Sequence, residues 1–330
     1  MVATIYDVAR AAGVSPSTVS RSLSVPDLVN AETRLRVQQI AAELGYRPNR
    51  AARGLITGRT GNIGLIVTDL SNPFFPEVVK GVQGRARESD YSVLLADTGE
   101  DPTVEVGLIR ALCKQVDGIV LCSSRMTEAD LRGVTGDTLT VLLNRRVSKV
   151  PAVTIDNADG IRQAVAHLQA LGHHRVGYVA GPRTSWSNRE RLRGLRAATT
   201  AAGLELVEVG AVAPHFAGGV AAADLVLSAG VTAVFAYNDL IALGLLNRFR
   251  AKNVSVPGDI SVIGVDDIMF SEMVSPSLTT LAQPKEQLGR VGVDLLLQLL
   301  QDADPSGAAR RTVTSQLVIR SSTGTAPPAR

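Results

Sequence analysis

The sequence predicts a small all-α head followed by a larger α/β body. Three short amphipathic helical patterns occupy residues 4 to 46, and from residue 62 onward apolar runs typical of buried strands alternate with helical patterns. The chain has 330 residues, 45% of them hydrophobic, which is too long for one ordinary core and sufficient for two or three compact units. The alternation in the body is typical of parallel sheets of the doubly wound kind.

The excess positive charge is concentrated in the head. Residues 1–60 contain eight arginines, no lysine and four acidic residues, whereas the rest of the chain carries 26 basic and 27 acidic side chains. A basic head on a nearly neutral body is the charge distribution expected of a nucleic-acid-binding module, although a solvated charged face gives the same distribution.

The first two helical patterns have clear start signals. Thr4, with Asp7 three residues later, forms a capping-box pattern, and Gly13 supplies the flexible turn after helix one. Ser15 is expected to cap helix two, and Pro16 occupies the first helical position, where its missing N–H has no cost. Two short helices separated by a tight turn are therefore predicted.

Helix two turns Val19 and Leu23 inward, because they are four residues apart. Small hydroxyls bind phosphate, and an arginine can make a two-point contact with guanine in the major groove. A serine-rich helix that faces only solvent would have the same pattern, so this face leaves both interpretations open. The residues expected to face outward or lie at the rim are Pro16, Ser17, Thr18, Ser20, Arg21, Ser22 and Ser24.

Asn30 is expected to cap a third helix that Gly45 closes. A turn of about four residues between helices one and two is the spacing of a DNA-binding helix-turn-helix rather than of a generic bundle. The inner stripe of helix three is expected to be Leu35, Val37, Ile40, Ala41 and Leu44.

Several strand patterns of the body end in polar residues that lead into loops. In open α/β sheets the ligand crevice lies at the carboxyl ends of the strands, so these residues are expected to converge there. The alternative for each is that a strand-terminal Asp or Asn only caps the next helix. The residues are Asp69 with Ser71 and Asn72, Asp97, Asp156 with Asn157, Asn238 with Asp239, and Asp266 with Asp267.

The sequence lacks the motifs of several other protein classes. It contains no P-loop, GxSxG, HExxH or GxGxxG motif, so we expect neither an enzyme nor a bound cofactor. The two cysteines and four histidines match no metal-site spacing. The N-terminus has no long apolar segment of a secretory signal, and no run of about 18 apolar residues occurs, which predicts a cytoplasmic protein that does not enter a membrane.

The segments TIYDVARAAGVSPSTVSRSLS and GYRPNRAARGL resemble the head of lac-repressor-type (LacI/GalR) regulators. The resemblance implies binding to double-stranded DNA, with Pro16 and Ser17 at base edges and only apolar contact available to Pro16. It also implies a hinge that becomes helical on DNA, where Leu55 wedges into a base step. Gly54 costs about 1 kcal/mol in a helix interior, and a flexible basic linker is the alternative. The expected DNA-binding residues are Thr4, Tyr6, Ser15, Pro16, Ser17, Thr18, Ser20, Arg21, Asn30, Thr33, Asn49, Arg50, Arg53 and Leu55.

In the body, DLSNPFF, LGHHRVGYVAGP, AYNDLIALG, IGVDD and SPSLTTLAQP resemble the periplasmic sugar-binding fold of the same regulator family. This resemblance implies two doubly wound parallel-sheet subdomains of the periplasmic-binding-protein type, with a small-molecule effector between them. Carboxylates, an arginine and an aromatic face suit a neutral sugar, and a purine or another metabolite stays open. The expected effector-binding residues are Phe74, Asp156, Arg191, Phe216, Asn238 and Asp266, with Trp186 and Ser187 beside Arg191.

The same resemblance predicts the organisation of the chain. We expect a DNA-binding domain at residues 1–48, a hinge at 49–60 and an effector-binding and dimerisation domain at 61–330. Its first subdomain is expected at about residues 61–158 and 286–311, and its second at about 159–285 and 312–325.

We further expect a homodimer on a palindromic operator, with a higher assembly left open. The helices near residues 74–85 and 287–300 are the dimer surfaces that the resemblance implies. The function expected is repression of a metabolic operon under the control of the effector. Whether the effector is an inducer or a corepressor depends on which of two states it binds more tightly.

Overall fold

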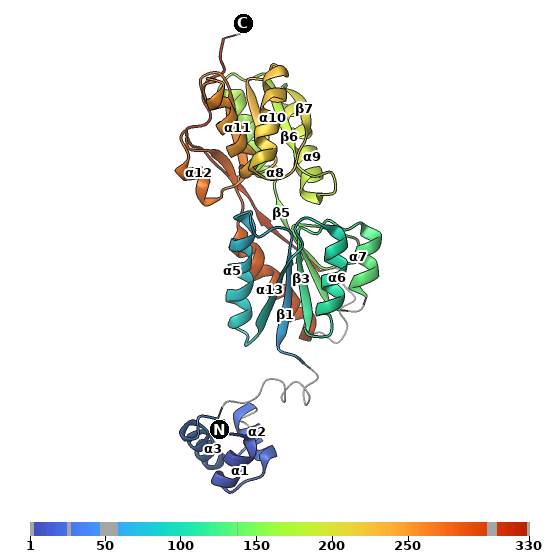
Figure 1. Ribbon diagram of the computed structural model, residues 1–330, viewed down its shortest axis with the longest axis vertical. Helices are drawn as coiled ribbons and strands as arrows, with labels where there is room; N and C mark the ends of the chain where they lie inside the picture. Colours follow the sequence, from blue (N-terminus) through green and yellow to red (C-terminus); the bar gives the residue numbers. More distant parts are fainter. Residues whose placement is uncertain (1–2, 25–27, 47–58, 137, 302–308, 329–330) are drawn as a thin grey trace. The chain divides into compact units, whose positions relative to one another are not determined.

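The computed structural model describes residues 3–24, 28–46, 59–136, 138–301 and 309–328. The chain divides into two compact units, Met1–Gly61 and Asn62–Arg330, which we call the head and the body. The head is helical and the body consists of two α/β lobes, as Figure 1 shows. Among the described helices, none is long and apolar enough to cross a membrane.

The head contains α1 (Ile5–Ala12), α2 (Pro16–Ser24) and α3 (Ala31–Glu43). The predicted capping box forms, because the Thr4 hydroxyl accepts from the Asp7 amide while the Asp7 carboxylate accepts from the Thr4 amide. The hydroxyl of Ser15 accepts from the amide of Thr18 and so caps α2. The three helices bury one small core, made of Val8, Ala9, Ala12, Val19, Val37 and Ala41.

Three predictions about side chains of the head are wrong. Leu35 and Leu44 are 62% and 43% exposed, because the buried face of α3 is defined by Val37 and Ala41 one turn apart. Ser22 is buried rather than outward, since it lies three residues after Val19 on the inner face of α2. Its hydroxyl donates to the carbonyl of Thr18 at 2.8 Å, which satisfies the buried group.

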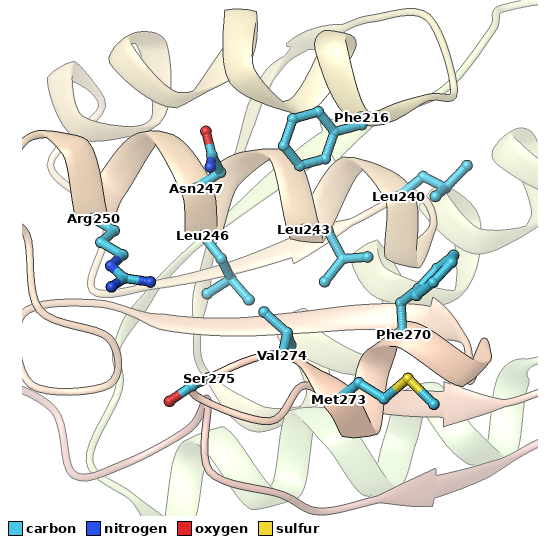
Figure 2. Close-up of a pocket in the computed structure, with 10 residues that line it drawn as sticks. All are labelled: Phe216, Leu240, Leu243, Leu246, Asn247, Arg250, Phe270, Met273, Val274 and Ser275. Atoms are coloured by element: carbon cyan, nitrogen blue, oxygen red, sulfur yellow. The ribbon is translucent and has the colours of Figure 1, made fainter.

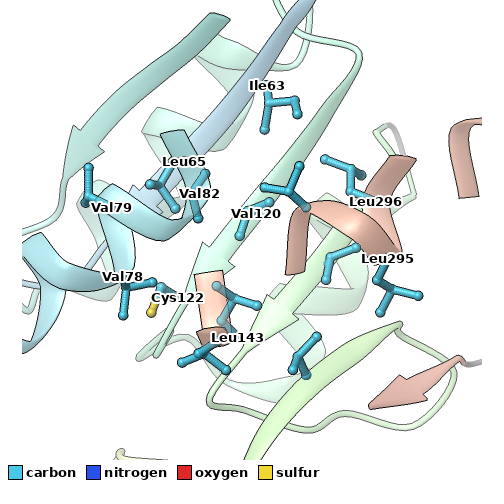
Figure 3. Close-up of a cluster of buried hydrophobic side chains, with 14 of the residues drawn as sticks. Ile63, Leu65, Val78, Val79, Val82, Val120, Cys122, Leu143, Leu295 and Leu296 are labelled. Carbon is cyan, nitrogen blue, oxygen red and sulfur yellow. The ribbon is translucent and has the colours of Figure 1, made fainter. Parts of the chain in front are cut away.

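The first lobe of the body has a six-stranded sheet with the order β11-β5-β4-β3-β1-β2, and all of its neighbouring strands are parallel. Helices α5 and α13 pack on one face of the sheet and α6 and α7 on the other, which is the doubly wound arrangement. Figure 3 shows the core under α5 and α13. The elements are β1 (Asn62–Val67), α5 (Phe74–Arg87), β2 (Ser92–Asp97), α6 (Pro102–Leu112), β3 (Gly118–Cys122), α7 (Glu128–Thr135), β4 (Thr140–Leu143), β5 (Ala152–Asp156), α13 (Lys285–Gln301) and β11 (Arg310–Thr314).

The second lobe repeats this plan with the strand order β12-β10-β9-β8-β6-β7, in which only the β10–β12 pair is antiparallel. Helices α10 and α11 cover one face of the sheet, and α8 and α9 cover the other. The elements are α8 (Ala158–Ala170), β6 (Arg175–Ala180), α9 (Trp186–Ala202), β7 (Glu205–Ala211), α10 (Phe216–Ser228), β8 (Ala233–Ala236), α11 (Asp239–Ala251), β9 (Ser261–Asp266), α12 (Met269–Met273), β10 (Thr279–Ala282) and β12 (Gln316–Val318).

Glycines allow the outer helices of each lobe to pack closely. A Cβ atom on Gly81 of α5 would lie 2.1 Å from the carbonyl oxygen of Glu286 in α13. In the second lobe, a Cβ on Gly219 of α10 would lie 2.1 Å from the carbonyl oxygen of Ile241 in α11. No side chain fits at such distances, so these positions fix how near the helix axes approach.

Candidate functional site

A small cavity lies between the two lobes of the body, beside the carboxyl ends of their strands. Its volume is about 20 Å³, so side chains fill most of the space between the lobes. The first lobe contributes Asn72, Phe74, Phe75, Glu100, Ser123, Arg125 and Asn144, and the second contributes Arg191, Pro214, Tyr237, Asn238 and Asp266.

Arg191 and Asp266 form the polar centre of the second lobe's contribution. Arg191 projects from α9, donates to the carbonyl of Tyr237 at 2.6 Å and lies 3.4 Å from Oδ1 of Asp266. Its guanidinium also stacks 4.9 Å from the centre of the Tyr237 ring. Burial raises the pKa of Asp266 to about 7, although the cation of Arg191 opposes this shift. Nε of Arg191 is buried without a hydrogen-bond partner among the described residues, so one donor is available to a ligand.

Arg125 and Glu100 form a second ion pair on the first lobe. Nε and Nη2 of Arg125 donate to the two carboxylate oxygens of Glu100 at 2.5 and 2.9 Å, and Nη1 donates to the carbonyl of Ser123 at 3.1 Å. Burial disfavours the charged guanidinium, but Tyr237 and the Glu100 carboxylate together raise the pKa of Arg125 above its ordinary value. Arg125 is therefore a fixed cation that faces both lobes.

A polar bridge between the lobes passes through Asn144. The Asn144 side chain donates to the hydroxyl of Ser123 at 3.1 Å, and its backbone carbonyl accepts from the hydroxyl of Ser187 in the other lobe at 3.2 Å. Oδ1 of Asn144 is buried and has no partner within the described residues. Buried polar atoms are normally paired, so this acceptor is a further candidate for contact with a bound molecule.

Backbone strain is concentrated around the cavity. Glu100, Ser123, Asn144, Asp266 and Asp267 all have positive φ, at 68°, 56°, 53°, 120° and 55°. Such conformations cost about 1–3 kcal/mol each in a residue other than glycine and persist where the surroundings hold them. Four of the five line the cavity and the fifth is the next residue in the chain, and such clustering of strained residues is common at functional sites.

Four of the predicted effector residues lie together at the cavity: Phe74, Arg191, Asn238 and Asp266. The other four do not line it. Asp156 is exposed and its carboxylate accepts from the amide of Ala158, which is the capping role weighed as the alternative. Trp186 is half-buried at the start of α9, and Phe216 lines a different pocket. The hydroxyl of Ser187 donates to the backbone carbonyl of Asn144.

Three other residues at strand ends have structural roles. The Asp97 carboxylate accepts from the amides of Leu70 and Gly99 and so holds two loops. Asp239 is fully buried and accepts from the amide of Ile268 and the hydroxyls of Ser271 and Thr280. Asp69 accepts from the amide and hydroxyl of Ser71.

Sequence reasoning did not identify several residues of the cavity. Glu100, Ser123, Arg125, Asn144 and Tyr237 lie at or just beyond the ends of strands that the sequence indicates, so extending the strand-end rule by a few residues would have found these five. Pro214 follows β7, a strand that was not predicted, and Phe75 lies within α5. Arg125 was hidden because an arginine in a loop normally faces solvent, and its burial depends on the second lobe. The missed residues are Phe75, Glu100, Ser123, Arg125, Asn144, Pro214 and Tyr237.

In the head, Tyr6, Ser15, Ser17 and Arg21 are exposed, whereas Pro16, Thr18, Ser20 and Thr33 are half-buried. Asn30 accepts from the amide of Glu32 and caps α3, and Thr4 takes part in the capping box of α1. Asn49, Arg50, Arg53 and Leu55 of the predicted hinge lie outside the described residues.

A larger apolar groove of about 520 Å³ lies on the outer side of the second lobe, away from the cavity residues. Figure 2 shows that Phe216 of α10, Leu243 of α11 and Phe270 of α12 point into it. Phe270 and Met273 are 44% and 71% exposed. Large exposed apolar side chains gathered in one groove are typical of a protein contact surface.

Comparison with known proteins identifies both units. Residues 4–49 match the model of bacterial regulatory proteins of the lacI family, and residues 165–323 match the periplasmic binding protein-like domain. The transcriptional repressor CytR of Escherichia coli (strain K12) is 35% identical, with 98% of this chain and 97% of CytR covered.

Two solved structures extend these matches. A lac repressor dimer bound to operator and an anti-inducer has a TM-score of 0.85 and 30% identity, over 98% of this chain and 100% of that chain. A regulator from Enterococcus faecalis with bound ribose has a TM-score of 0.71 and 30% identity, over 80% of this chain and 99% of that chain.

Proposed function

The chain belongs to the lacI family of bacterial regulatory proteins, and we propose that it represses a metabolic operon under the control of a small polar effector bound between its lobes. It is a transcriptional regulator that binds operator DNA as a dimer. The single observation that supports the effector site is the inter-lobe cavity, where two buried ion pairs and strained loops from both lobes converge.

The charges of this site favour a neutral ligand. Arg125 is paired with Glu100, so this cation is not left to neutralise an anion. Arg191 lies beside Asp266, whose pKa of about 7 leaves the carboxyl partly ionised near neutral pH. Carboxylates and guanidinium groups bind hydroxyls through two-point hydrogen bonds, and the ring of Phe74 offers a face to the C–H surface of a sugar. We therefore favour a sugar, which agrees with the ribose bound to the Enterococcus faecalis regulator. A purine is the second candidate, because an aromatic ring that lines the cavity also stacks on a base.

Base reading is assigned to α2 of the head. Arg21 and Ser17 are exposed, and the first turn of α2 presents amide groups suited to phosphate. Pro16 has no polar group to donate, so its contact with DNA is apolar. The hinge contribution of Arg50, Arg53 and Leu55 stays a prediction.

The apolar groove of the second lobe is assigned to the dimer contact. Its occupant would be the same groove of a second copy, because a two-fold dimer brings one patch against itself. Phe216, Phe270 and Met273 then become buried, which accounts for their exposure in a single chain. This surface lies outside α5 and α13, the helices near residues 74–85 and 287–300 that the resemblance implied as dimer surfaces, and those two helices stay a prediction.

Control follows from the difference in effector affinity between two arrangements of the lobes. A ligand that contacts both lobes stabilises the closed arrangement, and the dimer converts lobe closure into a change of head spacing. We place the protein in the cytoplasm, where its operator DNA lies.

A thermal-shift screen of sugars, nucleosides and other small metabolites against the full chain tests the effector proposal. A true effector raises the melting temperature in a concentration-dependent manner, because it binds only the folded state. Asp266→Asn should abolish this shift, whereas the matched change Asp156→Asn, at an exposed capping position outside the cavity, should preserve it. A shift that survives Asp266→Asn and disappears with Asp156→Asn would refute the assignment.

A further inference from the structure

The turn that carries Asp266 is strained and must be held in place. Asp266 and Asp267 are consecutive, and their φ values are 120° and 55°. Neither residue is glycine, so the two conformations together cost a few kcal/mol that other contacts must offset. The Asp266 carboxylate faces Arg191 in the cavity, so its position depends on this turn.

Lys285 supplies the missing contacts. It is the first residue of α13, is only 5% exposed, and its Nζ donates to the backbone carbonyls of Asp266 and Asp267, both at 2.7 Å. Nζ also lies 3.5 Å from a carboxylate oxygen of Glu77 on α5. An ammonium group has three donors, of which two make these short hydrogen bonds, while the Glu77 carboxylate balances the charge. A buried lysine without them would be strongly disfavoured.

These contacts join three elements around the cavity. Lys285 and Glu77 belong to the first lobe, whereas the Asp266–Asp267 turn ends β9 in the second. Glu77 is three residues from Phe74, which lines the cavity, and the carboxylate of Asp267 is separately fixed by Arg320 at 2.8 Å. The hydrogen bonds of Lys285 to the turn go to its backbone carbonyls, and the charge of Lys285 in addition lowers the pKa of the Asp266 carboxyl against the larger effect of burial.

We propose that Lys285 is a positioning residue of the effector site, which holds the Asp266–Asp267 turn and links it through Glu77 to helix α5. A displacement of the Asp266 carboxylate is then transmitted through Lys285 and Glu77 to α5, the helix that packs on α13. This role of Lys285 rests on the proposed function, because it presupposes that the effector binds at Asp266. Its test needs no effector, so failure of the link and failure of the effector proposal are distinguishable.

Hydrogen–deuterium exchange of the free, full-length protein tests the link. The Ile268 amide donates to Asp239 and the Ser271 amide donates to the carbonyl of Ile268, so their exchange rates report opening of the turn. Lys285→Met should raise these rates at least tenfold. Glu77→Gln, in the other lobe, should raise them severalfold although Glu77 has no contact with the turn in the structure.

Glu88→Gln is the matched control, because Glu88 follows α5 and pairs with Arg290 of α13 far from the turn. It should leave the exchange of the turn unchanged. In the Lys285→Met background, Glu77→Gln should have no further effect. If Lys285 only stabilises the fold, Glu77→Gln should change the exchange of the turn equally in the wild-type chain and in Lys285→Met. That result would overturn the proposal. So would an unchanged exchange rate of the turn in Glu77→Gln alone. If Lys285→Met fails to fold, the comparison of Glu77→Gln with Glu88→Gln decides.

Discussion

Arg21 is an exposed cation on α2, the helix to which base reading is assigned. Arg21→Ala should weaken operator binding by ~1–3 kcal/mol and reduce discrimination at one base pair, because a two-point contact with guanine is lost. Fluorescence anisotropy with operators that differ at single base pairs measures both effects. Arg10→Ala, which removes an exposed cation of α1, is the control and should leave base preference unchanged. Unaltered selectivity of Arg21→Ala would show that this residue contacts only phosphate.

The buried carboxyl of Asp266 makes stability depend on pH. Burial raises its pKa to about 7, so the folded protein binds this proton more tightly than the unfolded chain. The free energy of unfolding gained from Asp266 is therefore fully present below about pH 4 and is lost as the pH rises to about 7. Urea unfolding between pH 5 and 8 should show a decline on the order of a few kcal/mol that is weaker in Asp266→Asn. An identical pH profile for the variant would mean that Asp266 is ionised normally.

Among single residues, the sequence could predict those that reach the cavity because of their position in the chain alone. Asn238 and Asp266 sit at strand ends, where the doubly wound fold places its ligands. Arg125 and Glu100 could not be identified in this way, because both lie in loops and become a buried pair only when the loops and the second lobe meet. Asp156 was predicted at the cavity because it ends a strand, but its carboxylate accepts from the amide of Ala158 at the start of α8 instead.

At the scale of elements, replacing two glycines of α5 by alanine should change the free energy of unfolding in opposite directions. A Cβ on Gly81 would overlap the Glu286 carbonyl, so Gly81→Ala should separate α5 from α13 and cost ~1–3 kcal/mol. A Cβ on Gly84 would meet only the end of the Arg290 side chain at 3.5 Å, so Gly84→Ala should gain about 0.4–1 kcal/mol from helix propensity. Urea unfolding of both variants measures the difference. Equal stability would contradict the close approach of the two helices.

Element boundaries followed from local signals that the sequence displays. The Thr4–Asp7 capping box and the Ser15 cap both form, because each uses side chains within three residues of the helix end. The inner face of α3 was harder to predict, since Leu35 is apolar yet lies opposite Val37. Which side of a short helix is buried depends on how its neighbours pack, and periodicity alone does not determine that.

For the whole molecule, we expect a charged side chain in the apolar groove to dissociate the dimer. Met273→Asp places a charge in the proposed contact and should raise the dimer dissociation constant at least tenfold, because desolvating an unpaired carboxylate is costly. Leu225→Asp alters an exposed apolar residue of α10 that does not line the groove, and it should leave the dimer intact. Sedimentation equilibrium measures both constants. A stable dimer of Met273→Asp would move the interface to another surface.

The parallel sheets of the body follow from the alternation of strand and helix patterns, and the division into two lobes was implied by the resemblance to lac-repressor-type regulators. The likeness to the lac repressor dimer confirms the fold class. The identity of the effector does not follow from the fold, because related sites differ in only a few side chains around one scaffold. The ion pairs of Arg125 and Arg191 are the reason that we propose a neutral effector, and substitution of the cavity residues tests each candidate molecule.

We propose that one effector, bound between the lobes, controls specific DNA binding by the head. Selection of duplexes from a random pool with the full-length protein, followed by affinity measurements with and without the compound found by thermal shift, tests it most directly. We expect a palindromic consensus whose affinity changes at least tenfold with the compound, and a response that Asp266→Asn removes while DNA binding persists. Selected sequences without two-fold symmetry, or an affinity unaffected by a compound that binds the cavity, would contradict it.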